Sequence, residues 1–382
     1  MKLNFPLLAL AVGAFAIGTT EFSPMGFLPE IAQGLSISIP QAGMLVTAYA
    51  VGVMIGAPMM TLWFGKYSRR KALILLMGIF TIGNIFAAVA PSYLGLMAAR
   101  VITSLNHGAF FGIGSVVAAS LVPKEKQASA VATMFMGLTI ANIGGVPLAT
   151  WFGQNLGWRT AFATIASLGV VTMLSLYKAL PPLKSTQATN VKQEIQVLMR
   201  PRVLMALLTT VMGSGAMFSL YTYIAPSLKT FTHASATMIT VMLVLIGIGF
   251  SIGNHLGGKF VDRSIDKTLI GFLGVLIAVM VAFPVLATTS VGAGVALVIW
   301  GAAAFGIVPP LQMRVMSVAH EAAGLASSVN IGAFNLGNAV GAAAGGLVLS
   351  LNLGYGAVAM VGAVMAALSL GLVFWQMSWV KK

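Results

Sequence analysis

The segment Gly65-Lys66-Tyr67-Ser68-Arg69-Arg70-Lys71 separates two long apolar runs, at residues 44–64 and 72–90. Each run holds about 20 residues, enough for a helix to cross the ~30 Å hydrocarbon core of a bilayer. So short a connection between two spanning helices must be a tight turn at a membrane face. Its four cations predict that this face is cytoplasmic, because Lys and Arg are retained on that side during insertion. The orientation of every other span follows by counting crossings.

The composition is that of a membrane protein. Of 382 residues, 58% are hydrophobic and only 7% are charged, whereas soluble domains carry about 25% charged residues. We read the net charge of +14 as a set of topology determinants rather than a nucleic-acid surface. The chain has no cysteine, which excludes disulfides and thiolate metal sites, and no two of its four histidines have metal-ligand spacing. We therefore expect no metal and no cofactor.

The apolar runs predict an all-α polytopic protein with twelve transmembrane helices in two pseudo-symmetric six-helix bundles. Residues 1–180 form the first predicted bundle and residues 203–382 the second. Residues 181–202, the least apolar stretch, are interpreted as a cytoplasmic linker. This map places 18 of the 21 Lys and Arg, among them Arg314, in cytoplasmic segments, and it puts both termini in the cytoplasm. Arg100 is the one cation that it places inside a helix.

An internal repeat supports the division into halves. The offset between matching residues is 197 or 196 across the whole half, which chance does not supply; the pairs are Pro29 and Pro226, Gly65 and Asp262, Gly157 and Gly354, Asn142 and Asn338, and Gly145 and Gly341. A parallel repeat of six helices is typical of transporters whose halves rock around a midplane site.

Several motifs resemble those of the major facilitator superfamily, and the resemblance covers nearly the whole chain. They are the loop at residues 56–71 and its second copy at 258–267, Arg100-Val101-Ile102-Thr103-Ser104, the Gly- and Pro-rich stretch at 137–147, and Gly157-Trp158-Arg159. Within the superfamily, Thr20-Glu21-Phe22 and Asn106-His107-Gly108-Ala109-Phe110-Phe111 resemble arabinose- and sugar-efflux permeases of the twelve-helix drug–proton antiporter branch. The resemblance implies a monomeric bacterial inner-membrane transporter, with small molecules, protons and lipid as partners, and not an enzyme.

The loop motifs are candidate gating elements. In the superfamily, the loop acid resembles a latch on a helix N-terminus, where a negative charge is stabilised by ~0.3–1 kcal/mol. In the first half this acid is replaced by Gly65 and its partner Arg by Lys66, whereas the second half keeps Asp262 and Arg263. We assign Gly65, Lys66, Arg69, Asp262 and Arg263 to gating. Because Gly65 replaces the acid of the family motif, we expect a shifted equilibrium between the inward-open and outward-open states.

Glu21 is the candidate proton carrier. It is the one acid of seven that lies well inside an apolar helix, where a carboxylate costs several kcal/mol unless it is paired, neutralised or facing water. Arg100, Ser104, His107 and Phe111 recur at helical spacing on the fourth helix, and the resemblance places that helix beside the first. We assign proton coupling to Glu21, Arg100 and His107, whose imidazole has an ordinary pKa of about 6.5. The alternatives are a structural acid, a structural hydrogen-bond hub and a buried neutral histidine.

Candidate substrate contacts are aromatic side chains and a methionine on the helices that line the cavity in the superfamily, together with amides on the fifth and eleventh helices. They are Met25, Phe111, Asn142, Phe218, Tyr221, Tyr223, Trp300, Phe305, Asn335 and Asn338. Amides with aromatic faces suit sugars, and the same aromatics with 23 methionines suit an adaptable drug pocket. The sequence therefore predicts proton-coupled export of sugars or small amphipathic compounds by alternating access. A multidrug–proton antiporter and an uncoupled facilitator are the alternatives.

Overall fold

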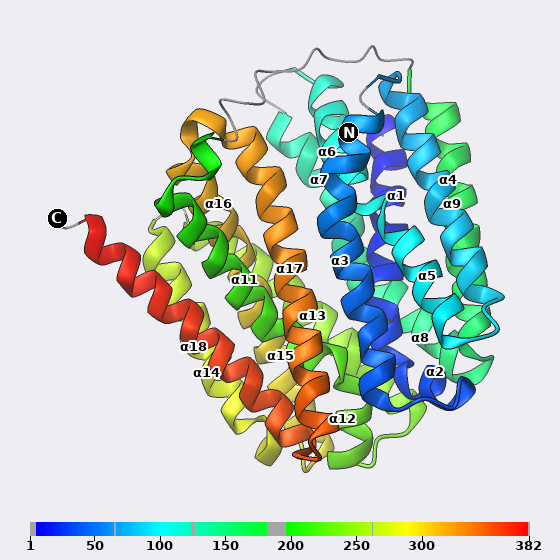
Figure 1. Ribbon diagram of the computed structural model, residues 1–382, viewed down its shortest axis with the longest axis vertical. Coiled ribbons are helices and arrows are strands. Elements are labelled where there is room, and N and C mark those ends of the chain that lie inside the picture. Colours follow the sequence, from blue (N-terminus) through cyan, green and yellow to red (C-terminus); the bar gives the residue numbers. More distant parts are fainter. Residues whose placement is uncertain (1–4, 65, 124–126, 182–195, 262, 381–382) are drawn as a thin grey trace. The chain divides into compact units, whose positions relative to one another are not determined.

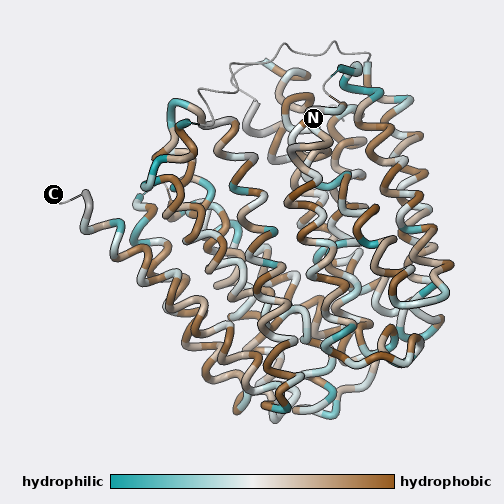
Figure 2. Tube along the Cα trace, in the orientation of Figure 1, coloured by the Kyte–Doolittle hydropathy of each residue, from teal (hydrophilic) through white to brown (hydrophobic). Residues whose placement is uncertain are grey.

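The computed structural model describes residues 5–64, 66–123, 127–181, 196–261 and 263–380, and in these ranges the regular structure is helical. Twelve segments are long and apolar enough to cross a membrane, which confirms the all-α, twelve-span prediction. Hydrophobic residues, brown in Figure 2, recur along the spanning helices. The chain divides into two compact units: Met1–Ile37 with Ala48–Gln187, and Ser38–Thr47 with Ala188–Lys382. The predicted linker lies mostly outside the described residues, and its boundaries remain a prediction.

The first unit is built on the helices before the linker, except for residues 39–47 of α3, which belong to the second unit (Figure 1). They are α1 (Phe5–Gly26), α2 (Leu28–Gly34), α3 (Ile39–Phe64), α4 (Arg69–Ala88), α5 (Tyr93–Ser104), α6 (His107–Ser120), α7 (Gln127–Ile140), the π-helical turn η2 (Ala141–Gly145), α8 (Val146–Asn155) and α9 (Trp158–Ala179). Helix α1 packs against α7 and α9, and α4 packs against α9. Its core includes Leu10, Ile17 and Phe110, which are fully buried.

The second unit repeats this arrangement (Figure 1). Its helices are α11 (Pro201–Thr222), α12 (Ile224–Phe231), α13 (Ala236–Val261), α14 (Ile265–Leu286), α15 (Ser290–Gly306), α16 (Val308–Val318), the 3₁₀ turn η3 (His320–Ala322), α17 (Ala323–Ser350) and α18 (Gly354–Val380). Helix α11 packs against α17 and α18, and α13 packs against α15.

Equivalent irregularities occur 197 residues apart in the two units. The first spanning helix of each is interrupted shortly before a proline: α1 gives way to α2 at Phe27, before Pro29, and α11 gives way to α12 at Tyr223, before Pro226. Gly157 and Gly354, which begin the sixth span of each unit, have positive φ angles of 91° and 77°. Ser36 and His233, also 197 apart, share φ angles of 52° and 50°. Because positive φ is uncommon, the matched positions show that the sequence repeat is also a backbone repeat.

A line of glycines joins α13 to α15. A Cβ atom on Gly249, Gly253 or Gly257 would collide with a backbone carbonyl of α15, at Val298, Ala302 and Gly306 respectively. The three glycines are four residues apart, so they lie on one face of α13. Small residues at this spacing allow the two helix backbones to approach directly, which is the usual packing of membrane helices.

Two details of the predicted map are wrong. The fourth span is not one continuous helix, because it is broken at Leu105 and Asn106 into α5 and α6. Arg100 is also not the one cation buried within a helix, because Arg314 lies in α16 with a side chain that is 8% exposed. Its Nη2 atom donates to Asp266 Oδ1 on α14 at 2.7 Å. This ion pair explains how a second arginine is tolerated there.

Candidate functional site

Glu21 lies in the middle of α1 and is 7% exposed. Every residue from Ile17 to Gly26 is buried, so this part of α1 is surrounded by protein on all sides. The preceding residue, Thr20, donates its hydroxyl to Asn84 Oδ1 on α4 at 2.8 Å. The Asn84 amide in turn donates to the Phe80 carbonyl at 3.0 Å, which fixes the acceptor. The carboxyl group is therefore held on a rigid helix and not on a mobile loop.

Arg100 reaches this region from α5 and is 1% exposed. Its Nη1 atom donates to the backbone carbonyl of Thr20 at 2.9 Å. The guanidinium carbon lies 4.1 Å from the centre of the Tyr49 ring, a cation–π contact with α3. Among the described residues, none hydrogen-bonds to Nε or Nη2 of Arg100. Arg100 is thus positioned by two contacts and retains buried donors for a further acceptor.

His107 begins α6, just after the break in the fourth span, and connects Tyr49 to Glu21. Its Nδ1 atom lies 3.2 Å from the Tyr49 hydroxyl, and its Nε2 atom lies 3.9 Å from Glu21 Oε2. When Glu21 is ionised, electrostatics favour a proton on Nε2, and Tyr49 then donates to Nδ1. At 3.9 Å the Glu21 carboxyl and the imidazole are too far apart for a hydrogen bond. A change in the charge of Glu21 therefore acts on the His107–Tyr49 pair electrostatically.

The second unit contains a different cluster, made of aromatic rings. Tyr221 on α11 lies 5.7 Å from Trp300 on α15 and 6.2 Å from Phe218, measured between ring centres. Phe250 on α13 completes the group, 5.5 Å from Tyr221 and stacked on Phe305 at 3.9 Å. Trp300 is fully buried, and among the described residues its indole N–H has no hydrogen-bond partner.

Comparisons with known proteins identify the family. The model of the Major Facilitator Superfamily matches residues 10–342. The chain belongs to this superfamily. It is 66% identical to the inner membrane transport protein YdhP of Escherichia coli (strain K12), over 92% of this chain and 90% of that protein. It is also 34% identical to the putative transporter AraJ of the same strain, over 90% and 88%.

Two further similarities are more distant. The chain is 32% identical to the chloramphenicol resistance protein of Streptomyces lividans, over 90% of this chain and 88% of that protein. Its fold matches the crystal structure of a D-xylose–proton symporter with a TM-score of 0.74 at 16% identity, over 95% and 96% of the two chains. The motif resemblance to the major facilitator superfamily is thus confirmed. The protein is a multi-pass membrane transporter and not an enzyme.

In the structure, the three residues predicted to couple protons lie in one cluster of the first unit. Their roles remain predictions. The structure adds Tyr49, which sequence reasoning missed and which contacts both Arg100 and His107. The sequence could have indicated Tyr49, because a tyrosine hydroxyl buried in an apolar span needs a polar partner. Phe250 was also missed, although it joins Phe305 to Tyr221 and Trp300.

The other predicted substrate residues of the first unit have distinct surroundings. Phe111 lies 5.2 Å from the His107 ring and stacks on Phe135 at 5.1 Å. Asn142 lies in the π-helical turn, where its amide donates to the Leu138 carbonyl at 3.0 Å. Met25 is fully buried in α1. Of these predicted substrate residues, Phe111 is therefore the one whose ring contacts a member of the Glu21 cluster, His107.

In the second unit, three predicted substrate residues make contacts between or within helices. The Tyr223 hydroxyl donates to the Ala342 carbonyl on α17 at 2.9 Å. Asn338 accepts a hydrogen bond from Ser214, which joins α17 to α11, and Asn335 donates to the Ile331 carbonyl at 2.9 Å. Tyr223 and Asn338 are thus engaged between helices, whereas Asn335 Oδ1 is buried with no hydrogen-bond partner among the described residues. The aromatic cluster is the larger group of candidate substrate contacts in this unit.

The predicted gating residues are described only in part. Gly65 and Asp262 lie outside the described residues. Lys66 places its ammonium 5.4 Å from the Tyr67 ring centre, Arg69 begins α4, and Arg263 lies just before α14. The gating roles of all five stay predictions. Within the described ranges, no group of three acidic or histidine side chains could hold a metal ion.

Proposed function

We propose that this protein couples proton movement to the export of sugars or small amphipathic compounds, and that Glu21 carries the proton. The observation that carries the proposal is the buried Glu21 carboxyl 3.9 Å from the His107 imidazole. An intramembrane acid is expensive to keep and is usually tied to ion or proton movement. The repeat of two six-helix halves supports alternating access.

Protonation of Glu21 alters the charge balance of the cluster. With Glu21 ionised, its charge offsets that of Arg100, and His107 presents an N–H to the carboxylate. With Glu21 protonated, the Arg100 charge is no longer offset, and the carboxylate charge that favours a proton on His107 Nε2 is lost. Glu21 is thus the proton carrier, while Arg100, His107 and Tyr49 are positioning residues that make its two protonation states different for the surrounding helices.

The aromatic cluster of the second unit supports the substrate part of the proposal. Sugar rings stack on aromatic faces, and the unpartnered Trp300 N–H offers one donor to a hydroxyl oxygen. A ligand that accepted this hydrogen bond would satisfy a buried polar group that otherwise costs about 1–3 kcal/mol. Phe218, Tyr221, Trp300 and Phe305 are the proposed contacts.

A multidrug–proton antiporter is the second candidate. The observation that favours it is the relative named as a chloramphenicol resistance protein, at 32% identity over most of both chains. The aromatic cluster would serve a flat amphipathic drug as well as a sugar ring. In an uncoupled facilitator, the third candidate, Glu21 would be a structural acid that stays paired with its neighbours.

The deciding experiment uses proteoliposomes with an imposed pH gradient. Wild-type protein and Glu21→Gln are challenged with a panel of sugars and with chloramphenicol, while proton flux is recorded. Glu30→Gln is the matched control, because it removes an acid from the adjacent helix α2. We expect one compound class to drive proton flux in the wild type and in Glu30→Gln, and flux to be lost in Glu21→Gln.

Other outcomes discriminate among the candidates. Proton flux driven by chloramphenicol but by no sugar would show that the protein is a drug–proton antiporter. Substrate movement without proton flux, equal in wild type and Glu21→Gln, would refute proton coupling and make the protein a facilitator.

A further inference from the structure

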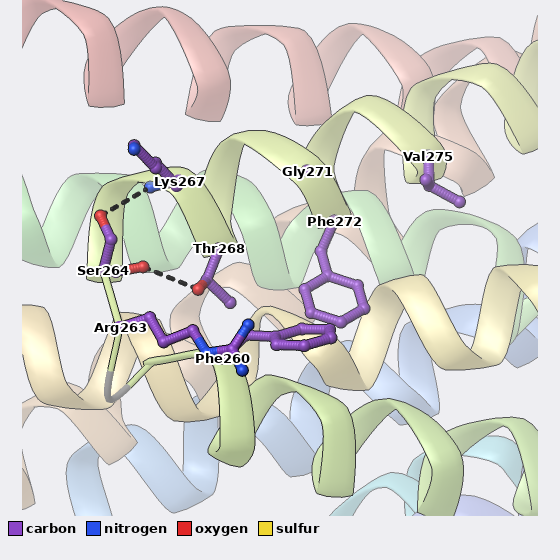
Figure 3. Close-up of a pocket in the computed structure, with 8 residues that line it drawn as sticks. All are labelled: Phe260, Arg263, Ser264, Lys267, Thr268, Gly271, Phe272 and Val275. Carbon is purple, nitrogen blue, oxygen red and sulfur yellow. Dashed lines mark hydrogen bonds between the residues drawn. The ribbon is translucent and has the colours of Figure 1, made fainter.

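A groove outside both clusters lies where α13 meets α14 (Figure 3). Its volume is about 500 Å³, and it is lined by Phe260, Arg263, Ser264, Lys267, Thr268, Gly271, Phe272 and Val275. Figure 3 shows Arg263 extending beside the Phe260 ring, with Phe272 facing them from α14. The groove is open on one side, because Phe260 and Val275 are 37% and 45% exposed. It shares no lining residue with the Glu21 cluster or the aromatic cluster.

The groove changes from charged to apolar along α14. Arg263, Ser264 and Lys267 lie at the start of the helix, and Phe272 and Val275 lie two to three turns further on. Eleven residues of helix separate Ser264 from Val275, a rise of about 16 Å, or roughly half of the hydrocarbon core. A ligand that fills the groove must therefore have an anionic end at the membrane surface and an apolar end within the bilayer.

The hydroxyl groups of the groove are already engaged. Ser264 Oγ accepts from the backbone N–H of Lys267 at 3.3 Å, and Thr268 donates to the Ser264 carbonyl at 2.7 Å (Figure 3). The nearby Asp266 is paired with Arg314 at 2.7 Å, which compensates its charge. The guanidinium of Arg263 and the ammonium of Lys267 are consequently the groups that a ligand's anion would meet.

We propose that this groove binds an anionic phospholipid. Its phosphate lies against Arg263 and Lys267, and one acyl chain follows Phe260, Phe272 and Val275. Basic pockets between spanning helices are suited to anionic headgroups, and the apolar half excludes a simple soluble anion as the preferred ligand. Space for the chain exists at Gly271, where no described atom lies within 4 Å of the position that a Cβ would occupy.

Two matched pairs of variants test the proposal. Arg263→Gln removes one groove cation, and Lys259→Gln removes an exposed cation from the end of α13 that does not line the groove. Gly271→Leu places a side chain in the apolar half of the groove. Gly274→Leu is its control, because Gly274 also faces open space on α14 but lies outside the groove. Both leucines suit a helix, so neither is expected to impair folding.

The measurement is binding of phosphatidylglycerol to the purified full-length chain in neutral detergent, by native mass spectrometry, with phosphatidylcholine as the uncharged reference. We expect Arg263→Gln to weaken phosphatidylglycerol binding about fivefold, which corresponds to about 1 kcal/mol for one basic residue. Gly271→Leu should weaken it at least as much. Lys259→Gln and Gly274→Leu should bind like the wild type.

Three results would overturn the proposal. One is equal binding of phosphatidylglycerol by all five proteins. Another is equal binding of the two lipids by the wild type. The third is displacement of phosphatidylglycerol by inorganic phosphate at the same concentration, since this would show that the apolar half contributes nothing. None of these results depends on transport, so the lipid site and the proposed function can fail separately.

Discussion

Glu21 and Phe218 occupy the same position in the two repeats, 197 residues apart, yet their surroundings are chemically opposite. Glu21 is near an imidazole and has an arginine bonded to the preceding carbonyl, whereas Phe218 adjoins a cluster of aromatic rings. The backbone irregularities that recur at this offset show that the helices are built alike. The repeated architecture therefore does not determine the chemistry, which depends on a few side chains in each unit. We expect proton handling to depend on the first unit and substrate affinity on the second.

The largest difference in stability should appear between substitutions at Arg100 in the first unit and at Leu297, the equivalent position of the second unit. Arg100→Met removes a buried cation and should lower the free energy of unfolding by ~3–5 kcal/mol, because the Thr20 carbonyl loses its hydrogen bond and the Glu21 carboxylate loses a nearby positive charge. Leu297→Met, 197 residues later and fully buried, keeps volume and polarity and should cost less than about 1.5 kcal/mol. Chemical unfolding in detergent measures both.

A double variant sharpens this test. Adding Glu21→Gln to Arg100→Met removes the uncompensated charge and should recover part of the lost stability. Equal destabilisation by Arg100→Met and Leu297→Met would show that the polar cluster has no special energetic role.

The next contrast compares two buried tyrosine hydroxyls. Tyr49→Phe removes the hydroxyl group that faces His107, and Tyr223→Phe removes a hydrogen bond to the Ala342 backbone. Each should cost about 1 kcal/mol of stability. Only Tyr49→Phe should shift the pH at which transport is half-maximal, because only Tyr49 contacts a titrating group. A pH profile of transport that is identical in both variants would remove Tyr49 from the proton pathway.

Substrate affinity should respond to the aromatic cluster. Trp300→Phe keeps an aromatic ring but loses the indole N–H, and should raise the substrate concentration for half-maximal transport about two- to tenfold, with the pH profile unchanged. Trp375→Phe, on a half-exposed tryptophan of α18, is the control and should leave affinity unchanged. A pH shift in Trp300→Phe would contradict the division of roles between the units.

The smallest effect concerns an exposed ion pair of the second unit. Arg200 hydrogen-bonds to Glu321 through both carboxylate oxygens, at 2.9 and 2.7 Å, which holds the pKa of Glu321 below its ordinary value of 4.5. Because the folded-state pKa is the lower one, the pair stabilises the fold above pH 4.5 and loses this contribution as the pH falls through the folded-state value.

Glu321→Gln should therefore lower the melting temperature slightly near neutral pH, less at high salt, and not at all in strong acid. Melting curves of wild type and variant across that range measure this difference. A difference that grows as the pH falls would show that the pair does not act through its charges.

Much of the fold was predictable because length and apolarity alone identify a membrane span. The rarity of charges in those spans also singled out Glu21 and Arg100. The structure places Glu21 next to His107 and bonds Arg100 to the carbonyl of the residue before Glu21. The offset of 197 predicted the repeat, which reappears in the φ angles of Gly157 and Gly354. These predictions rest on properties that a bilayer imposes on any chain.

What was missed depends on local packing. The helix break at Leu105 and Asn106 contains no proline, so nothing in the sequence indicated that the fourth span would be interrupted there. Tyr49 gives no periodic signal in an apolar helix, and its importance emerges only when α3, α5 and α6 are in place. Arg314 was counted among the cytoplasmic cations, and its burial was not foreseen because its partner, Asp266, lies 48 residues away in the sequence.

The glycine line of α13 has a consequence for how this protein can vary over evolutionary time. At Gly249, Gly253 and Gly257 the smallest possible change, one methyl group, meets a main-chain carbonyl that cannot rotate aside. A neighbouring side chain could adjust to such a change, but a neighbouring backbone cannot, so no second mutation nearby restores the fit. Lipid-facing positions can exchange one apolar side chain for another during evolution, but these three glycine positions cannot. A saturation library selected for folded protein should therefore retain glycine at these three codons and tolerate replacements at Gly258, which faces open space one residue further on.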